Sequence, residues 1–363
     1  MQRRRGFVSR WSVSVLTGVL AAAVAAPPAA ATHSASFGPT QTLARADFGT
    51  AQVEATTGTD GRVHGFMTTE FLRSEISYFE GRGSRWRVEK TPYRGFVTAT
   101  AHDQTATYLL LRTRENGLRI VKRLASGQYT GGHELHPAGP TPDLHGDLVV
   151  RDGRWWAVWG LRYEGFERDM ELFEASTFGG ALVRRQVTGS AARDWSPTLA
   201  LGPGAAPTAY LVWVRAGSLW SAVASRPGAW RNARQLGGRA ASPDLVVADG
   251  VLHLAWRRDG AVWYGVGTAE RMTSQRASAE PTGSDGARLA VSKGHAFIVF
   301  SHSTGSRTLL ASRQTTGSSW RTTVLWANSY DWNQFSITAI NGRATVFVGA
   351  SKSGAVLLRS QER

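Results

Sequence analysis

Seven segments of the chain share one pattern, and this internal repeat limits the possible folds more than any other feature of the sequence. When one apolar position of each segment is aligned, neighbouring positions lie 44 to 51 residues apart. The aligned positions are Val53, Val97, Leu148, Leu199, Leu245, Leu289 and Ile337. A repeat of this length, about 40–50 residues, is typical of propellers, in which each repeat forms one four-stranded sheet.

The segment from Ala241 to Ala279 shows the pattern most clearly. It holds four strand-like runs, and tight turns at Asp249–Gly250 and Asp259–Gly260 bound the second of them. Glycine readily takes the positive φ that a two-residue hairpin requires. Each repeat therefore predicts four antiparallel strands, and no segment after the N-terminus shows a long helical period.

Two further sequence signals recur at fixed positions within the repeat. An aromatic residue follows the hairpin glycine by six positions in three repeats, and a Trp-Arg pair opens the fourth strand in three repeats. The residues are Trp159, Trp256 and Phe300, with the pairs Trp86–Arg87, Trp230–Arg231 and Trp320–Arg321. We therefore predict an all-β, seven-bladed β-propeller, with six blades as the variant because the first two repeats are the least regular.

The last repeat, from Phe335 to Arg363, has room for only three strands, whereas the segment from Thr40 to Phe48 is a spare strand before the first repeat. The simplest closure makes this N-terminal strand the outer strand of the last blade. We expect residues 32–363 to form a single propeller domain.

Residues 1–31 have the composition of a secretory signal peptide: a basic start, an apolar run from Ser12 to Ala26, and a small-residue cleavage site at Ala29–Ala31. The sequence predicts a secreted protein with a mature start near Thr32. Arg4–Arg5 leaves both the general secretory and the twin-arginine route open, and a membrane anchor is the rival interpretation. We expect a monomer with no integral membrane association.

The first strands Ser196–Leu199 and Ser242–Leu245, and the Asp-Gly turns that a tryptophan follows, give the repeat a style that resembles the secreted sialidase-like (BNR-type) bacterial β-propeller superfamily. The resemblance covers nearly the whole chain after residue 31 and implies the fold. The sequence contains no intact S-x-D-x-G-x-x-W box and no Phe-Arg-Ile-Pro motif, so the resemblance does not extend to sialidase activity.

The formal net charge of +15 is consistent with an anionic partner such as an acidic polysaccharide, and the alternative explanation is an arginine-rich genomic composition. The chain contains no cysteine, which excludes disulfides and thiolate chemistry. No recognition helix, P-loop, GxSxG or HExxH motif occurs. We therefore expect no nucleic-acid partner, no cofactor and no metal.

Two loops before predicted first strands carry an Asp-Trp pair, Asp194–Trp195 and Asp331–Trp332, and Tyr330 precedes the second pair. Aromatic faces beside carboxylates suit sugars, and the alternative is that the tryptophans fill gaps between blades. His145, just before an innermost strand, is the candidate general base. A long insert in the third repeat adds Tyr163 and Glu164, and the candidate anion-binding arginines are Arg162, Arg215 and Arg257.

These features favour a propeller that binds extracellular glycan, anionic or mixed. The alternative is a carbohydrate-active enzyme. A glycosidase would draw two carboxylates from Asp194, Asp331 and Glu164, and a lyase would use His145 or Tyr163 as base. A protein-interaction propeller is the third possibility.

Overall fold

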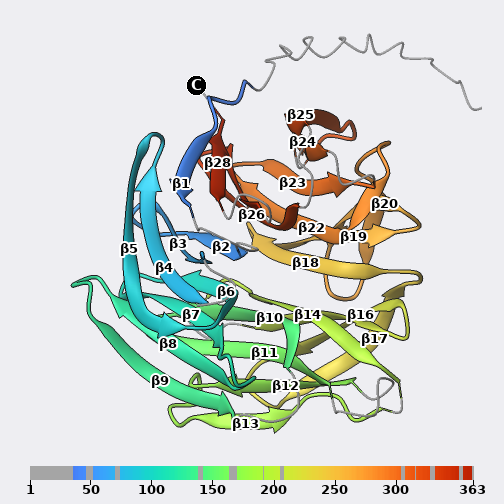
Figure 1. Ribbon diagram of the computed structural model, residues 1–363. Helices are drawn as coiled ribbons and strands as arrows, with labels where there is room; N and C mark the ends of the chain where they lie inside the picture. Colours follow the sequence, from blue (N-terminus) through green and yellow to red (C-terminus); the bar gives the residue numbers. More distant parts are fainter. Residues whose placement is uncertain are drawn as a thin grey trace, which may run out of the picture. The chain divides into compact units, whose positions relative to one another are not determined.

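The fold was described from a computed structural model of the chain (Figure 1). The structure describes residues 36–45, 52–69, 74–137, 142–162, 170–190, 192–204, 208–303, 307–314, 316–327, 332–350 and 355–361. These residues form seven four-stranded antiparallel sheets. No segment of this described chain forms an apolar helix of membrane-spanning length.

Each of the first six sheets is built from four consecutive strands. Blade 1 is β2 (Gln52–Thr57), β3 (Val63–Thr68), β4 (Glu75–Arg82) and β5 (Arg85–Arg94). Blade 2 is β6 (Phe96–His102), β7 (Ala106–Arg112), β8 (Leu118–Leu124) and β9 (Tyr129–His136). Blade 3 is β10 (Pro142–Arg151), β11 (Arg154–Arg162), β12 (Met170–Ser176) and β13 (Val183–Gln186).

The remaining blades follow the same order. Blade 4 is β14 (Asp194–Leu201), β15 (Ala209–Arg215), β16 (Ser218–Ala224) and β17 (Trp230–Gly237). Blade 5 is β18 (Ala241–Ala248), β19 (Val251–Arg258), β20 (Ala261–Gly267) and β21 (Met272–Arg276). Blade 6 is β22 (Thr282–Ser292), β23 (His295–His302), β24 (Arg307–Gln314) and β25 (Arg321–Ala327).

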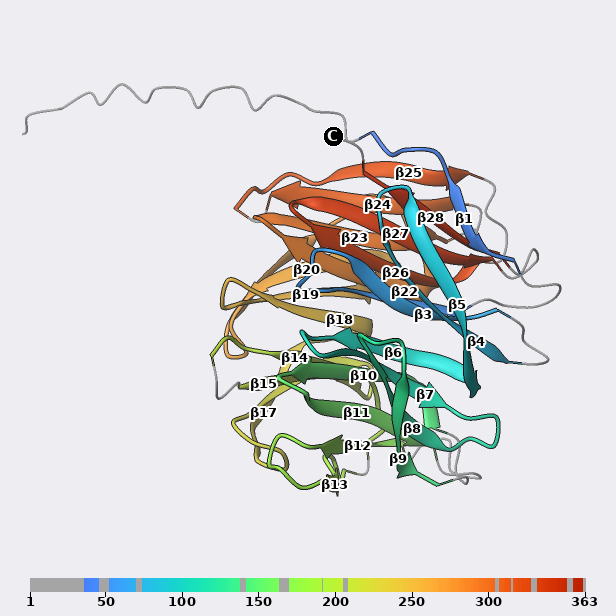
Figure 2. The ribbon, with the colours of Figure 1, turned by 90° about the vertical axis from the view of Figure 1, so that its left-hand side faces the viewer.

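Blade 7 closes the ring with a strand from the start of the chain. It consists of β26 (Trp332–Ile340), β27 (Arg343–Ala350), β28 (Val356–Ser360) and, as its outer strand, β1 (Gln41–Ala44). Figure 2 shows β1 beside β28. The predicted closure is therefore confirmed, and it pairs a sheet edge of β28 that would otherwise remain open.

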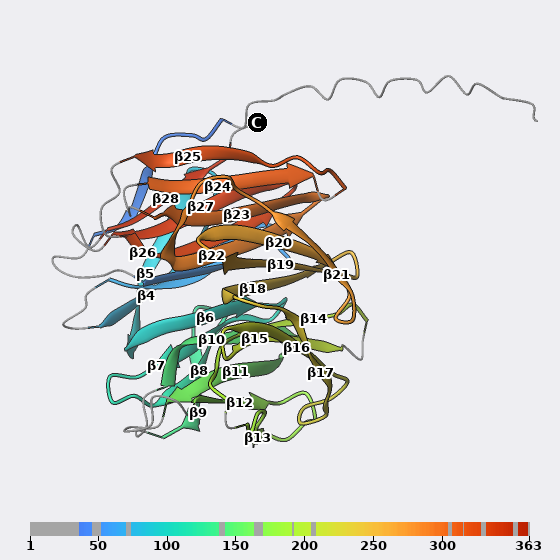
Figure 3. The same cartoon turned by 90° about the vertical axis from the view of Figure 1, so that its right-hand side faces the viewer.

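The first strands of the blades form a closed cycle of contacts, from β2 through β6, β10, β14, β18 and β22 to β26 and back to β2. They lie innermost in Figure 1, and successive sheets follow one another in Figure 3. The expected seven-bladed β-propeller is confirmed, and the six-bladed variant is excluded.

Local turn chemistry agrees with the predicted hairpins. Asp249 and Gly250 have φ values of 51° and 76°, and Asp152–Gly153 and Asn341–Gly342 repeat this pair of positive angles. Two positive φ angles in succession are the signature of the tight turn that matches strand twist. The Asp-Gly and Asn-Gly pairs thus fix the connection between first and second strands.

The repeated Trp-Arg tryptophans pack each blade against the preceding one. Trp86 of β5 lies 5.6 Å from Phe347 of blade 7, and Trp230 of β17 lies 5.4 Å from Trp156 of blade 3, measured between ring centroids. Trp320, just before β25, lies 5.1 Å from Tyr264 of blade 5. Large aromatic rings at these positions bury apolar area between sheets, which explains why the sequence repeats them.

Candidate functional site: the axial pocket

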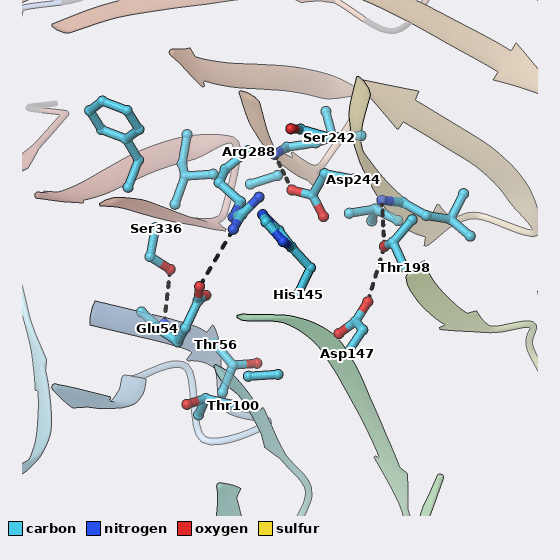
Figure 4. Close-up of a pocket in the computed structure, with 18 of the residues that line it drawn as sticks. Glu54, Thr56, Thr100, His145, Asp147, Thr198, Ser242, Asp244, Arg288 and Ser336 are labelled. Atoms are coloured by element: carbon cyan, nitrogen blue, oxygen red, sulfur yellow. Dashed lines mark hydrogen bonds and ion pairs between the residues drawn. The ribbon is translucent and has the colours of Figure 1, made fainter. Parts of the chain in front are cut away.

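A cavity of about 1340 Å³ lies along the propeller axis, lined by residues of all seven first strands. The inner edge of each blade contributes to its wall, because the first strands surround the axis. Figure 4 shows a close-up of this wall, with polar side chains from several blades directed into one space.

The wall contains a ring of polar side chains, one from each first strand: Glu54, Thr98, Asp147, Thr198, Asp244, Arg288 and Ser336. Several of them bind the backbone of the next blade. The Asp147 carboxylate accepts hydrogen bonds from the Leu199 amide at 2.7 Å and the Thr198 hydroxyl at 3.0 Å. The Thr198 hydroxyl oxygen in turn accepts the Leu245 amide at 3.1 Å.

The same arrangement recurs further around the ring. Asp244 accepts the Leu289 amide at 2.6 Å, and the Ser336 hydroxyl accepts the Ala55 amide at 2.9 Å. An inner strand edge has no further strand to pair with, and buried amides require partners. The polar ring therefore satisfies the inner edges of the blades. The bond to Ala55 also shows that Ala55, not Val53, is equivalent to Leu289, so the sequence alignment of blade 1 was two residues out of register.

The ring is unbalanced in charge. Three carboxylates, those of Glu54, Asp147 and Asp244, face one guanidinium, that of Arg288, whose Nη2 lies 3.8 Å from Glu54 Oε1. Burial raises the pKa of Glu54 to about 8 despite the nearby Arg288. Burial likewise raises the pKa of Asp147 to about 6, although two backbone amides donate to it. Burial also raises the pKa of Asp244.

One guanidinium cannot compensate three carboxylates in a confined space, so the carboxylate with the poorest donors holds a proton most firmly. Asp147 and Asp244 accept backbone amides, whereas the hydrogen bond that lowers the Glu54 pKa comes from the Ser336 side chain. Glu54 is therefore the group of this pocket that is protonated near neutral pH.

Several buried polar atoms of the wall have no hydrogen-bond partner among the described protein atoms. They are Gln52 Oε1, Thr100 Oγ1, Ser196 Oγ and Thr338 Oγ1. Ser196 is 2 % exposed and Thr338 is 4 % exposed. Because buried polar atoms are rarely left unpaired, these four atoms call for water or a polar ligand in the pocket.

His145, predicted from the sequence as the candidate base, lines the axial pocket, and Figure 4 labels it among the side chains of the pocket wall. Its ring meets Trp195 edge to face, with centroids 6.5 Å apart, and Trp195 also lines the pocket. The structure thus brings together two of the predicted site residues.

Arg257, predicted as an anion-binding residue, lines the axial pocket too. Its Nη1 donates to the Gly283 carbonyl at 3.0 Å. It also lines a second cavity of about 510 Å³, between the hairpin tips of blades 4 and 5. Arg257 therefore lies between the two cavities.

Asp194 and Arg215 do not reach the pocket. They are paired across β14 and β15, with Arg215 Nε and Nη2 donating to the Asp194 carboxylate at 2.7 and 2.9 Å. The Trp213 indole donates to the same carboxylate at 2.8 Å, and Asp194 is fully buried. Asp194 is thus buried within blade 4, away from the axial pocket, and its predicted role in ligand binding stays a prediction.

The other predicted residues lie outside what the structure describes. Tyr163, Glu164, Tyr330 and Asp331 fall outside the described residues. Arg162 and Trp332 belong to strands β11 and β26, but their side chains are not described. Their predicted roles stay predictions.

Sequence reasoning missed Glu54, Asp147, Asp244 and Arg288. A signal was present, because the residue just before the aligned apolar position is charged at Asp147, Asp244 and Arg288. A charged residue inside an apolar innermost strand needs a polar surface to face, and the axis is the one such surface shared by all blades.

Comparison with known proteins locates the fold but no family. No protein-family model and no curated protein sequence matches the chain. The BP39L lectin from Burkholderia pseudomallei is similar in structure with a TM-score of 0.64 and 11% identity, over 86% of this chain and 95% of that one. A Kuenenia stuttgartiensis hydrazine synthase chain has a TM-score of 0.57 and 12% identity, over 87% and 97% of the two chains.

The Aleuria aurantia lectin in complex with Fucα1-6GlcNAc has a TM-score of 0.53 and 10% identity, over 79% of this chain and 97% of that one. At such low identity these likenesses show the β-propeller fold alone. The β-propeller fold that the sequence resemblance implies is thereby confirmed.

Proposed function

We propose that this chain is a secreted β-propeller that binds extracellular carbohydrate, and that a sugar residue of the ligand occupies the axial pocket. The observation that carries the proposal is the polar wall with its four unpartnered buried oxygens. A sugar hydroxyl both donates and accepts hydrogen bonds, so one bound ring can satisfy several such atoms at once. Two of the similar solved structures are lectins, which supports the same class of ligand.

The position of Trp195 supports this ligand class. Its ring lines the pocket beside His145, and the Arg193 guanidinium lies 5.4 Å from the ring centroid. An aromatic ring at the edge of a polar cavity gives the C–H face of a sugar an apolar surface, while the wall binds the hydroxyls.

The charges of the ring favour a neutral sugar over the acidic one that net charge alone favours. A carboxylate or sulfate ligand would face the carboxylates of Asp147 and Asp244, with Arg288 as the cation of the ring. Like charges at short range cost more in a confined pocket than in water. We therefore expect the net positive charge of the chain to act at long range and the pocket to select a hydroxyl-rich neutral residue.

A glycan array followed by titration calorimetry tests the proposal. Arg288→Gln removes a pocket cation, and Arg231→Gln on the exposed outer strand β17 is the matched control. Loss of one charge-assisted hydrogen bond weakens affinity by about tenfold or more. We expect that loss in R288Q alone, with little change between low and high salt. Absence of binding to every glycan, or equal affinity of both variants, would refute the proposal.

A second candidate function, glycoside hydrolysis, is favoured by the raised pKa of Glu54. A general acid must hold its proton near neutral pH while a neighbouring carboxylate is ionised, and the pKa values of about 8 for Glu54 and about 6 for Asp147 provide such a pair. Incubation with each bound glycan and analysis of released sugars tests this. Glu54→Gln should abolish the release of sugars while glycan binding persists. If the unaltered chain binds glycans but releases no sugar, the hydrolase function is refuted and carbohydrate binding alone remains.

Secretion is tested separately by expressing the full chain and sequencing the exported protein. We expect its first residue near Thr32. An exported protein that retains residues 1–31, or a chain that stays in the cell, would contradict secretion through a cleaved signal peptide.

A further inference from the structure

A second cluster of polar side chains lies away from the axial pocket, between blades 1 and 2. It consists of Asp60 in the β2–β3 turn, His64 of β3 and His102 at the end of β6. One ligand atom from each residue lies within 4.8 Å of the other two. The two imidazole rings stack with centroids 4.0 Å apart. None of the three residues lines the axial pocket.

Hydrogen-bond directions around Tyr78 determine which nitrogen of His64 carries a proton. The Tyr78 hydroxyl donates to Glu80 Oε2 at 3.0 Å, because a carboxylate accepts. A phenol has one proton, so its oxygen must accept the bond from His64 Nδ1 at 2.6 Å. Nδ1 is therefore protonated, and Nε2 of a neutral His64 is a lone-pair acceptor.

That lone pair faces a carboxylate. His64 Nε2 lies 3.1 Å from Asp60 Oδ1 and 3.2 Å from Asp60 Oδ2. Two acceptors at this distance repel each other unless a cation lies with them. The side chain of His64 is 6 % exposed, so water screens the pair poorly.

Blade 5 contains an aspartate, a histidine and a tyrosine at the positions of Asp60, His64 and Tyr78, but its histidine has no lone pair facing a carboxylate. His253 lies four residues after Asp249, and its Nδ1 is 2.5 Å from the Tyr264 hydroxyl. Val266 pairs with His253 at the position where Glu80 pairs with His64. Without a carboxylate to take its proton, Tyr264 donates to His253 Nδ1.

The other nitrogen of His253 then donates to a backbone carbonyl, in keeping with its hydrogen bond to the backbone of Ala248. His253 is thereby satisfied as a neutral side chain, and burial lowers its pKa. Glu80 is thus the residue that reverses the network in blade 1 and turns the free lone pair of His64 outward to Asp60.

His102 supplies the third ligand. Its Nδ1 lies 2.9 Å from the Thr107 hydroxyl, which in turn hydrogen-bonds to Tyr78. Because the one proton of the Tyr78 hydroxyl is used in the hydrogen bond to Glu80, the Thr107 hydroxyl donates to Tyr78 and accepts from His102 Nδ1. Nε2 of His102 is left as a lone-pair donor to a cation.

We propose that Asp60, His64 and His102 bind a divalent transition-metal ion of the Zn²⁺ type between blades 1 and 2. Two imidazoles and one carboxylate are ligands that such ions prefer, and three protein ligands leave a position for water. Tyr78, Glu80 and Thr107 orient the rings, as outer hydrogen bonds do in metal sites. Asp60 is 46 % exposed in its side chain and lies in a turn, so it can approach the ion. The site departs from the expectation of no metal that the sequence motifs gave.

The test uses the untagged full-length chain after treatment with a chelator. Zn²⁺ binding is measured by calorimetry, Co²⁺ binding by its visible absorption, and thermal stability with and without Zn²⁺. The variants are Asp60→Asn, His102→Asn and Glu80→Val, which copies blade 5. Asp249→Asn is the matched control, because Asp249 is the exposed blade 5 counterpart of Asp60.

We expect one equivalent of Zn²⁺ per chain, a visible Co²⁺ spectrum with nitrogen ligands, and a melting temperature raised by about 2 °C or more. Affinity should fall at least about tenfold in each of the three variants and stay unchanged in D249N. No binding by the unaltered chain, or binding that persists in D60N and H102N, would overturn the proposal. In that case a proton on His64 Nε2, and not a metal ion, stabilises its contact with Asp60.

Discussion

Replacement of Asp194 by alanine should destabilise the propeller strongly while leaving the axial pocket intact. The carboxylate is fully buried and accepts hydrogen bonds from Arg215, Trp213 and Ser190. Alanine removes the acceptor of all these donors. The Trp213 indole is 1 % exposed, so its N–H would find no water to replace the carboxylate.

The expected cost follows from these contacts. Leaving the buried Trp213 N–H unpaired costs about 1–3 kcal/mol. Breaking a buried ion pair costs about 3–5 kcal/mol in total, and the Arg215 side chain, 20 % exposed, recovers part of its hydration. We expect a loss near 4 kcal/mol for D194A and roughly half of that for D194N, which keeps the shape and one acceptor oxygen.

Urea unfolding and thermal melts measure this loss. At roughly 2 °C per kcal/mol for a large domain, D194A should melt about 8 °C lower than the parent chain. Asp259→Asn is the matched control, because its ion pair with Arg239 is exposed on both sides and is worth less than about 1 kcal/mol. Equal melting temperatures for D194A and D259N would refute the structural role given to Asp194. Loss of ligand binding in folded D194A would instead restore it as a site residue.

Three further changes test the axial ring and the closure. The Glu54 pKa is about 8 in the folded protein against an ordinary 4.5, so the folded state binds a proton that the unfolded state releases, and stability should fall as pH rises from 4.5 to 8. In thermal melts across this pH range, E54Q should show a smaller fall in melting temperature than the parent chain. Equal falls in the two proteins would contradict the prediction. Thr198→Val leaves the buried amide of Leu245 without its acceptor and should lower the free energy of unfolding in urea by about 1–3 kcal/mol. A loss below about 0.5 kcal/mol would show that the ring does not stabilise the fold. Deletion of residues 36–45 removes β1 and opens the edge of β28, so the melting temperature should fall by several degrees and aggregation should rise; an unchanged melt would show that closure contributes nothing.

The blades and their closure could be predicted from the sequence because their signals are local and repeated. An Asp-Gly pair such as Asp249–Gly250 favours a tight turn wherever it occurs, and the Trp-Arg tryptophans recur at three blade interfaces for the same packing reason. The spare segment containing β1 was recognisable because one repeat lacked a strand. Such signals do not depend on which blade lies next to which.

The role of Asp194 could not be predicted, because it depends on a backbone irregularity. The register of β14 shifts between Trp195 and Thr198, and Ser196 has a φ of 48°. This bulge decides that Asp194 faces Arg215 across the strand pair while Trp195 reaches the pocket. A pattern of residue types does not show on which side of a bulge a side chain emerges.

The axial ring separates residues that hold the fold from residues that can respond to a ligand. Asp147 and Asp244 are held by backbone amides of the next blade, so moving either would leave a buried amide unpaired. Glu54 and Arg288 instead interact with each other, with Arg288 Nη2 at 3.8 Å from Glu54 Oε1. A ligand hydroxyl placed between them replaces a long ion pair by two shorter hydrogen bonds without disturbing any strand. Among the ring residues, specificity should therefore be altered through those of blades 1 and 6, and substitutions of those in blades 3 to 5 should change stability first.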